Sequence, residues 1–304
     1  MNLKEIEYIV KIAEEGNITH AAEKLFITPS ALNQQLLHLE KEIGTQLFQR
    51  IRSGWIPTKA GEIYLQGAHE ILRIKKETYQ QLQDAVNTQK GFLTVSFPSE
   101  RGSHMFTHVY PVFHKRYPEI IVNVKETTVR SQQALISKGD VDIGFLTLRP
   151  NQQTGDTYIH ICREELVLVV PDNHPICTHA KKNSISKYPE IELSELKEDP
   201  FALIYKDSTI YECTKQIFLE AGFSPNVLFE TSRAATILTM VSSGLCCSII
   251  PDSESLEHID GVTFLSLSTH PFWNLEASYK RGSYLSEPAK YFISLATRYW
   301  NGEL

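Results

Sequence analysis

The 304-residue sequence has no apolar run that approaches the roughly 18 residues needed to cross a bilayer. Its first residues are charged and amphipathic rather than signal-like. It has only five cysteines, an odd number at irregular spacings, which does not suggest a secreted disulfide framework. We therefore expect a cytoplasmic protein that does not associate with a membrane.

Enzyme and cofactor signatures are missing too. The sequence has no GxGxxG, P-loop, GxSxG, HExxH or CxxC motif, and no internal repeat. His104, His108 and His114 come nearest to a metal set, but no cysteine cluster or aspartate accompanies them. Although a triad scattered along the chain is not excluded in this way, we expect no enzyme activity, no cofactor and no metal.

Basic residues are fewer than acidic ones, 30 against 36. The first 90 residues contain 11 of each, so the whole acidic excess lies later in the chain. That excess discourages the later part from lying on nucleic acid. The length is sufficient for two or three domains, each with its own core.

Residues 17–61 give the clearest signal of function. Ala21 and Ala22 lie on a short helix and leave room for a second helix to cross closely. The second helix begins with helix-entry residues, because Thr28 suits the N-cap and Pro29 suits the first turn. Two short helices joined in this way form a helix-turn-helix. An earlier helix ending at Gly16 would support it, with apolar residues Ile6, Ile9, Val10 and Ala13.

The second helix has one apolar face and one polar face. At helical spacing the predicted buried stripe is Leu32, Leu36, Leu39 and Ile43. The opposite face carries Ser30, Gln34, Leu37 and Lys41, flanked by Asn33 and His38. Asn and Gln can pair with adenine edges in the major groove, so this face is typical of a recognition helix.

A basic segment without acidic residues follows at 45–61. It includes Arg50, Arg52 and Lys59, and Gly54-Trp55 is predicted to form the tip of a two-stranded wing. We expect DNA contacts from Thr19, His20, Thr28, Pro29, Ser30, Asn33, Gln34, His38, Arg50, Arg52 and Lys59. The alternative is a helical packing module whose polar face only meets water.

Several spaced motifs in this region resemble those of one known family. They are Ala21-Ala22-x-x-Leu25, Ser30-Ala31-Leu32-x-x-Gln35, Leu39-Glu40-x-x-x-Gly44-x-x-Leu47-Phe48-x-Arg50 and Thr58-x-Ala60-Gly61. Together they resemble the winged helix-turn-helix of LysR-type transcriptional regulators. The resemblance implies a DNA-binding domain over 1–60, a dimer-forming linker helix over 61–90, and an effector-binding domain over 91–304.

A long amphipathic helix is predicted from about Thr58 to Thr88. Its apolar residues occupy heptad positions, with Lys75 on the one remaining core position: Leu65, Ala68, Leu72, Tyr79, Leu82 and Val86. A seam of this kind favours pairing with a second copy, and the family resemblance implies a dimer and then a tetramer through the C-terminal domains. The alternative is a helix packed on its own C-terminal domain.

Strands and helices alternate after residue 91, which predicts a mostly parallel sheet. Predicted strands are 92–97, 120–124, 141–146, 166–170, 201–205, 227–229, 246–250 and 275–279, and residues 159–163 are expected to extend toward a second unit of alternating strands and helices. Predicted helices are 99–116, 129–138, 209–221, 234–243 and 286–300. By resemblance this part is a two-lobed α/β domain like periplasmic binding proteins, with lobe I at about 91–162 and 268–304 and lobe II at about 163–267.

A cleft between two such lobes would collect helix N-termini and strand ends, where small anions bind. The predicted effector-binding residues are Ser99, Arg101, Thr128, Thr147, Tyr205, Ser208, Thr231 and Ser232. Arg101 is the expected counter-ion for a carboxylate or other anion. For each hydroxyl the alternative is a helix cap with no ligand. Cys246-Cys247 is interpreted as a buried apolar pair rather than a redox pair, and no function is assigned to residues 177–193.

The expected function is therefore that of a transcription regulator that binds specific double-stranded DNA and responds to a small effector. The alternative from another class is a cytoplasmic solute-binding or enzymatic α/β protein with a helical dimerisation module.

Overall fold

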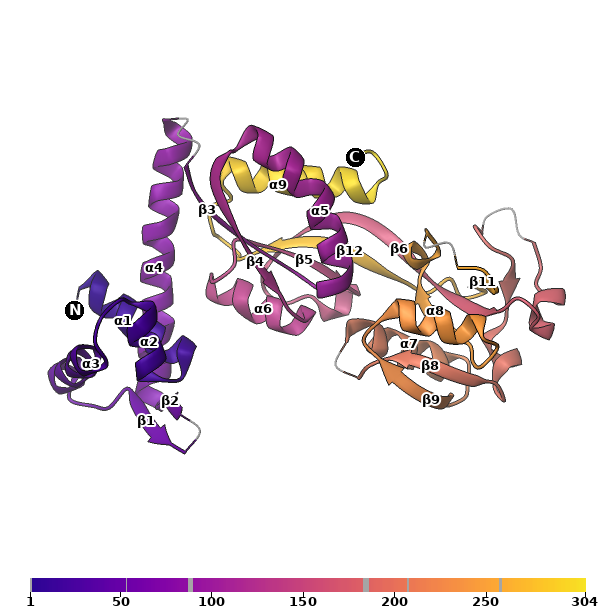
Figure 1. The fold of residues 1–304 in the computed structure, drawn as a ribbon, viewed down its shortest axis with the longest axis horizontal. Coiled ribbons are helices and arrows are strands. Elements are labelled where there is room, and N and C mark those ends of the chain that lie inside the picture. The colour runs from indigo at the N-terminus through magenta and orange to yellow at the C-terminus, as the bar shows by residue number, and fades with distance from the viewer. Residues whose placement is uncertain (1, 53, 87–89, 183–185, 207, 257–258) are drawn as a thin grey trace.

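The computed structural model describes residues 2–304 except 53, 87–89, 183–185, 207 and 257–258. Figure 1 shows a small N-terminal domain, a long upright helix beside it, and a two-lobed α/β part that extends away from that helix. This is the multi-domain α+β architecture predicted from the sequence. Among the described residues, no helix combines the length and apolarity needed to span a bilayer.

The N-terminal domain packs helices against a short hairpin. Its elements are α1 (Leu3–Glu15), α2 (Ile18–Lys24), α3 (Pro29–Ile43), β1 (Phe48–Ile51) and β2 (Gly54–Pro57). Ala21 and Ala22 are fully buried, so α2 and α3 cross closely as the small-residue pair predicted. Gly16 ends α1 in the left-handed conformation (φ +56°), which also confirms the predicted stop.

The long helix α4 (Lys59–Ala85) begins at Thr58, whose hydroxyl accepts a hydrogen bond from Gly61 N at 3.0 Å. Leu65 and Ala68 are buried in the core of the N-terminal domain. The later seam residues are exposed in the single chain, as with Tyr79 at 59%. The predicted end at Thr88 lies outside the described residues.

The two lobes follow α4. The first lobe contains β3 (Lys90–Phe97), α5 (Ser99–Arg116), β4 (Glu119–Glu126), α6 (Val129–Lys138), β5 (Ile143–Leu148) and η1 (Pro150–Gln152). The second contains η2 (Pro175–Thr178), β7 (Glu190–Ile191), η3 (Leu193–Leu196), β8 (Pro200–Ile204), α7 (Thr209–Glu220), β9 (Asn226–Thr231), α8 (Ala234–Ser242), β10 (Ser248–Pro251), η4 (Asp252–Leu256) and β11 (Val262–Leu267). Strand β6 (Thr157–Pro171) and strand β12 (Phe272–Tyr279) connect them, and α9 (Glu287–Trp300) ends the fold.

The large sheet is mixed, so the prediction of a mostly parallel sheet was wrong. Its order is β4-β3-β5-β12-β6-β11-β7, with β10 also pairing with β6. Strands β4, β3 and β5 are parallel, and β8 pairs in parallel with β9. Two antiparallel pairs arise because β12 returns from the second lobe and inserts between β5 and β6. In the second lobe β10 and β11 also pair antiparallel with β6.

Strand β6 is continuous over 15 residues, whereas the sequence predicted a strand only at 166–170, after a connecting stretch at 159–163 and Glu164-Glu165. Adjacent acids usually mark a solvent-exposed break, but Glu164 is only 7% exposed. Its carboxylate is satisfied by three donors from separate elements, which removes the reason for a break. The uninterrupted strand therefore runs through both lobes.

Helix α9 packs back on the first lobe, as expected. Phe292 of α9 lies with its ring 5.2 Å from that of Phe113 of α5, edge to face. Figure 1 shows α5 and α9 on one face of the sheet and α6 on the other. The second lobe has its own apolar core, which includes Phe201 and Phe218.

Candidate functional site

Helix α3 separates its buried face from its exposed face much as the spacing predicted. Leu32, Leu36 and Leu39 are at most 2% exposed. Ile43 is an exception at 44%, because it lies in the last turn, beyond the crossing with α2. Thr28 caps the helix by accepting from Ala31 N at 3.2 Å, and Pro29 fills the first turn.

The opposite face of α3 is largely exposed. Ser30 and Gln34 are exposed, as are Leu37, His38 and Lys41, while Asn33 is half-buried. Thr19 and His20 are exposed in the first turn of α2, which Asn17 caps. The polar side chains at the start of α3 therefore present their donors and acceptors to solvent.

The wing is the hairpin β1–β2, and its tip differs from the prediction. Ile51 pairs with Gly54, so the turn contains Arg52, while Gly54 and Trp55 begin β2. Gly54 is required by packing: a Cβ there would lie 2.4 Å from Gly16 O. The Gly16 carbonyl also accepts a hydrogen bond from Trp55 N at 2.8 Å, which holds the start of β2 against the end of α1.

The basic residues of the wing are exposed. Arg50 lies on β1 and Arg52 at the turn, and neither makes an ion pair within the described part of the chain. Lys59, at the start of α4, pairs with Glu62 at 3.0 Å. Because both groups of that pair are exposed, the pair is weak and leaves Lys59 able to bind a phosphate.

A cleft of about 620 Å³ lies between the two lobes. Seven of the eight predicted effector-binding residues line it: Ser99, Arg101, Thr128, Thr147, Tyr205, Ser208 and Ser232. Thr231 does not, because it lies in the last position of β9, where its hydroxyl accepts from Arg233 N at 3.3 Å. Its placement in the cleft was therefore wrong.

The first turns of α5, α6, α7 and α8 all contribute to this lining. Free backbone N–H groups and the helix dipole favour negative charge at each of these ends. The predicted helix caps are correct for Thr128 and Ser208, whose hydroxyls accept from Ser131 N and Tyr211 N. Ser99 is instead the first residue of α5, since the N-cap position is Pro98.

Arg101 is not an unpaired counter-ion. Its guanidinium forms an ion pair with Glu164 of β6, and the two side chains are 18% and 6% exposed. The Glu164 carboxylate also accepts from Trp273 Nε1 at 2.6 Å and from Ser253 N at 3.0 Å. Arg101 Nε itself is buried without a hydrogen-bond partner among the described residues. The positive charge is thus largely compensated by the protein.

Several lining residues were missed by the sequence reasoning. They are Pro98, Glu100, Thr127, Val129, Ile204, Thr209, Ile210, Arg233, Ala234, Pro251, Glu254 and Trp273. Those beside a predicted residue, such as Glu100 and Arg233, could have been found by extending each helix start by one position. Trp273 reaches the cleft through the long-range pairing of β12 with β6, for which the local sequence carries no signal.

The cysteines form no site of their own in the described structure. All five are free thiols, and Cys246 and Cys247 are 2% exposed, in agreement with a buried apolar pair. Burial raises the pKa of Cys247 to about 12. Among the described residues, no group of three or more His, Cys, Asp or Glu side chains could hold a metal ion.

Comparison with known proteins assigns both parts of the chain. Residues 3–62 match the model of the bacterial regulatory helix-turn-helix protein, lysR family, and residues 87–301 match the LysR substrate binding domain. Two relatives from Bacillus subtilis strain 168, the uncharacterized HTH-type transcriptional regulator YcgK and the HTH-type transcriptional regulator AlsR, are each 26% identical. The matches cover 97% of this chain in both cases, and 94% and 90% of the relatives.

Solved structures share the fold of the whole chain. A full-length OxyR variant from Pseudomonas aeruginosa superimposes with a TM-score of 0.72 at 24% identity, covering 98% of this chain and 93% of that one. Full-length CbnR in complex with its target DNA gives 0.58 at 21% identity, covering 98% and 99%. The relatives are named as transcriptional regulators and not as enzymes, which decides against the solute-binding or enzymatic alternative. The chain belongs to the LysR family of DNA-binding transcriptional regulators.

Proposed function

We propose that α3 enters the major groove of specific double-stranded DNA and reads bases through Ser30, Asn33 and Gln34. The observation that carries this proposal is the exposed, uncharged start of α3 together with two exposed wing arginines that form no ion pair with any described residue. Arg50 and Arg52 would bind phosphates on the flanking backbone. Thr19, His20, Thr28, Pro29, His38 and Lys59 complete the proposed contact surface.

We further propose that the interlobe cleft binds a small anionic effector, a carboxylate or another small anion. Four helix N-termini converge there, and the buried Arg101 Nε offers one unused donor. Because Glu164 already compensates the charge of Arg101, backbone N–H groups and hydroxyls supply most of the attraction. Hydroxyl groups line both sides of the cleft, among them those of Thr147 and Tyr205. The hydroxyls of Thr128 and Ser208 also line it, but they donate to Ser131 Oγ and Tyr205 O within the protein.

The proposed assembly is a homodimer through the α4 seam, with two dimers joined by the C-terminal domains into a tetramer. Leu82 at 57% and Val86 at 69% exposure leave the seam uncovered in the single chain. A second copy of α4 would bury it. The effector would act by differential affinity for two arrangements of this assembly in the cytoplasm.

The test uses the full-length protein and labelled fragments of the DNA next to its own coding region. We expect specific binding by fluorescence anisotropy at physiological salt, with a scrambled fragment of equal length as the control. Thermal-shift titration with succinate, citrate, phosphate and amino acids tests the effector, because a bound ligand raises the melting temperature by mass action. Equal affinity for the scrambled fragment under all these conditions would refute the DNA-reading proposal.

A further inference from the structure

Helix α6 connects the interlobe cleft to the linker helix α4. Thr128 and Val129 at its start line the cleft, and the loop after its end contacts α4 through Asp140 and Asp142. We propose that α6 transmits the state of the cleft to α4, and through α4 to the DNA-binding domain. This inference rests on the proposed function in taking the cleft as the effector site.

An ion pair connects the first turn of α6 to the second lobe. Arg130 forms an ion pair with Glu212 in the first turn of α7. The other oxygen of that carboxylate accepts from Gln152 Nε2 at 2.7 Å, next to the end of β5. Because α7 belongs to the second lobe, any change in the separation of the lobes must strain or relax these contacts at the start of α6.

The middle of α6 is held by buried contacts, so the helix can transmit a displacement of its first turn to its other end. Gln132 and Ile136 are fully buried. The Gln132 amide accepts from Ser96 Oγ at 3.0 Å and donates to Thr127 O at 3.3 Å. Ten residues of helix span about 15 Å, so a displacement of the first turn reaches the loop at residues 139–142.

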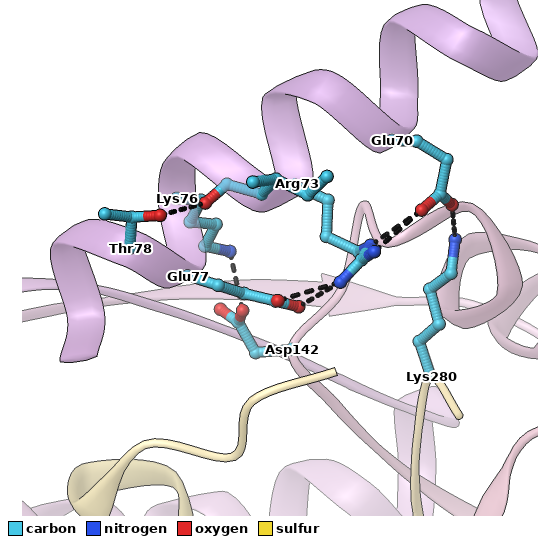
Figure 2. A network of polar contacts seen from close by, with 8 residues as sticks. Glu70, Arg73, Lys76, Glu77, Thr78, Asp142 and Lys280 are labelled. Carbon is cyan, nitrogen blue, oxygen red and sulfur yellow. Dashed lines mark hydrogen bonds and ion pairs between the residues drawn. The ribbon is translucent and has the colours of Figure 1, made fainter. Parts of the chain in front are cut away.

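That loop is attached directly to α4. Asp142 pairs with Lys76, Oδ1 to Nζ, at 2.6 Å, and Asp140 lies 3.3 Å from His69, Oδ1 to Nδ1. Figure 2 shows Lys76 pointing from α4 toward Asp142. Gly139 permits the close approach, because a Cβ there would lie 3.3 Å from Arg73 Cδ at a backbone φ of +85°.

Further polar contacts extend the same interface along α4 (Figure 2). Arg73 donates to both oxygens of Glu77 at 2.7 and 2.8 Å, and also to Glu70, which pairs with Lys280 beyond β12. In the last turn of α4, Asp84 accepts from Tyr284 Oη at 2.8 Å and from Glu287 N at 3.0 Å. The interface residues on α4 are His69, Glu70, Arg73, Lys76, Glu77 and Asp84.

These residues follow helical spacing and form a face of α4 distinct from the apolar seam. The seam therefore stays available to a second copy while the charged face holds the regulatory domain. Partly exposed ion pairs contribute little free energy each, so this interface can rearrange at low cost, unlike an apolar core. An interface that rearranges at low cost is suited to joining α4 to a regulatory domain that changes between two states.

The test is hydrogen exchange of the free full-length protein, without DNA or effector. Glu212→Gln removes the negative charge that pairs with Arg130. We expect amides at residues 69–80 of α4 to exchange about fivefold faster, which is the lower end of the range of allosteric coupling factors. Lys197→Met, an exposed lysine of the second lobe, is the control and should change nothing in α4. The charge swap Arg130→Glu with Glu212→Arg should restore slow exchange.

The coupling is reciprocal, so Lys76→Met should speed exchange in the first turns of α6 and α7 by a similar factor. Exchange changes confined to the residues around each substitution would overturn the inference. Anisotropy with the DNA fragment, run on the same variants, separates the two proposals. Faster α4 exchange in a protein that binds no DNA supports the coupling and counts against the DNA-reading role. Specific DNA binding with unchanged α4 exchange overturns the coupling alone.

Discussion

Gly61 lies against the carbonyl group of Leu47 so closely that a Cβ on residue 61 would be 1.9 Å from Leu47 O. The same oxygen accepts a hydrogen bond from Thr58 N at 2.9 Å. Gly61 is in the first turn of α4, and Leu47 directly precedes the wing. The linker helix therefore starts in direct contact with the DNA-binding domain, which fixes its direction relative to the wing.

Gly61→Ala should destabilise this domain by about 1–3 kcal/mol or more, because the backbone carbonyl cannot move aside. Urea unfolding followed by circular dichroism measures the change. Gly67→Ala on the same helix is the matched control, since a Cβ there would meet no described atom within 4 Å outside its own stretch of the helix. It should be neutral or stabilising by about 0.5–1 kcal/mol. Equal destabilisation by both variants would contradict the packing explanation.

Gln34→Ala should change which bases are preferred, and it should lower discrimination at one operator position by about 1–3 kcal/mol. Arg52→Ala should instead weaken binding to all sequences and reduce the slope of log affinity against log salt by about one. Affinity measured on a set of single-base operator variants at several salt concentrations separates these effects. The assignment of roles is wrong if Arg52→Ala changes base preference and Gln34→Ala does not.

Glu164→Ala should lower the free energy of unfolding by about 3–5 kcal/mol, because it leaves the buried charge of Arg101 unpaired. Adding Arg101→Met should recover part of this loss. Glu119→Ala, which removes an exposed pair with Lys90, should cost about 1 kcal/mol or less and is the control. Thermal or urea denaturation measures all of these. Additive effects of the two substitutions would show that the pair is not coupled.

The thiols should fall into two reactivity classes. Burial raises the pKa of Cys213, Cys246 and Cys247, to about 12 for Cys247, so these thiols should be inert in the folded protein. Cys162 and Cys177 are half-buried. Titration with a disulfide reagent at about pH 8 should detect no more than two thiols before unfolding and five afterwards. Rapid reaction of a third native thiol would contradict the burial of this group.

The α4 interface should weaken in acid. The hydrogen bond from Lys280 lowers the pKa of Glu70 below 4.5. Burial raises the pKa of Asp140, but the hydrogen bond and charge of His69 together with the charges of Lys125 and Lys138 lower it below 3.8 overall. A carboxyl group with a lowered folded-state pKa stabilises the fold above its unfolded pKa, and this contribution is lost as the pH falls through the folded value. The stability difference between the unmodified protein and Glu70→Gln should therefore be full at about pH 6 and shrink below about pH 4.5. A difference independent of pH would refute the role of the charge.

The sequence was most informative where structure is decided locally. Thr28, Pro29 and Gly16 mark helix ends through their own backbone preferences, and all three behave as predicted. Ser99 does not cap α5, because the helix begins at Ser99 itself and Pro98 occupies the N-cap position. Helix boundaries are uncertain at this level, and a cap assignment shifts with them.

The cleft was harder to predict because its electrostatics depend on residues far apart in the chain. The local sequence around Arg101 indicates a free cation at a helix start. Its partner, Glu164, is 63 positions later, and Trp273 is another 109 beyond that. The twist and order of the sheet bring them together, and neither can be obtained from hydrophobic periodicity alone.

The insertion of β12 between β5 and β6 has a consequence for biosynthesis. The ribosome releases the DNA-binding domain and α4 long before residues 272–279 exist, yet the sheet of the first lobe lacks its central strand until then. The buried side chain of Phe145 in β5 stays uncovered on the side of the missing strand during this interval. The nascent chain can therefore complete its helix-turn-helix domain early, while the first lobe is completed only after β12 has been translated.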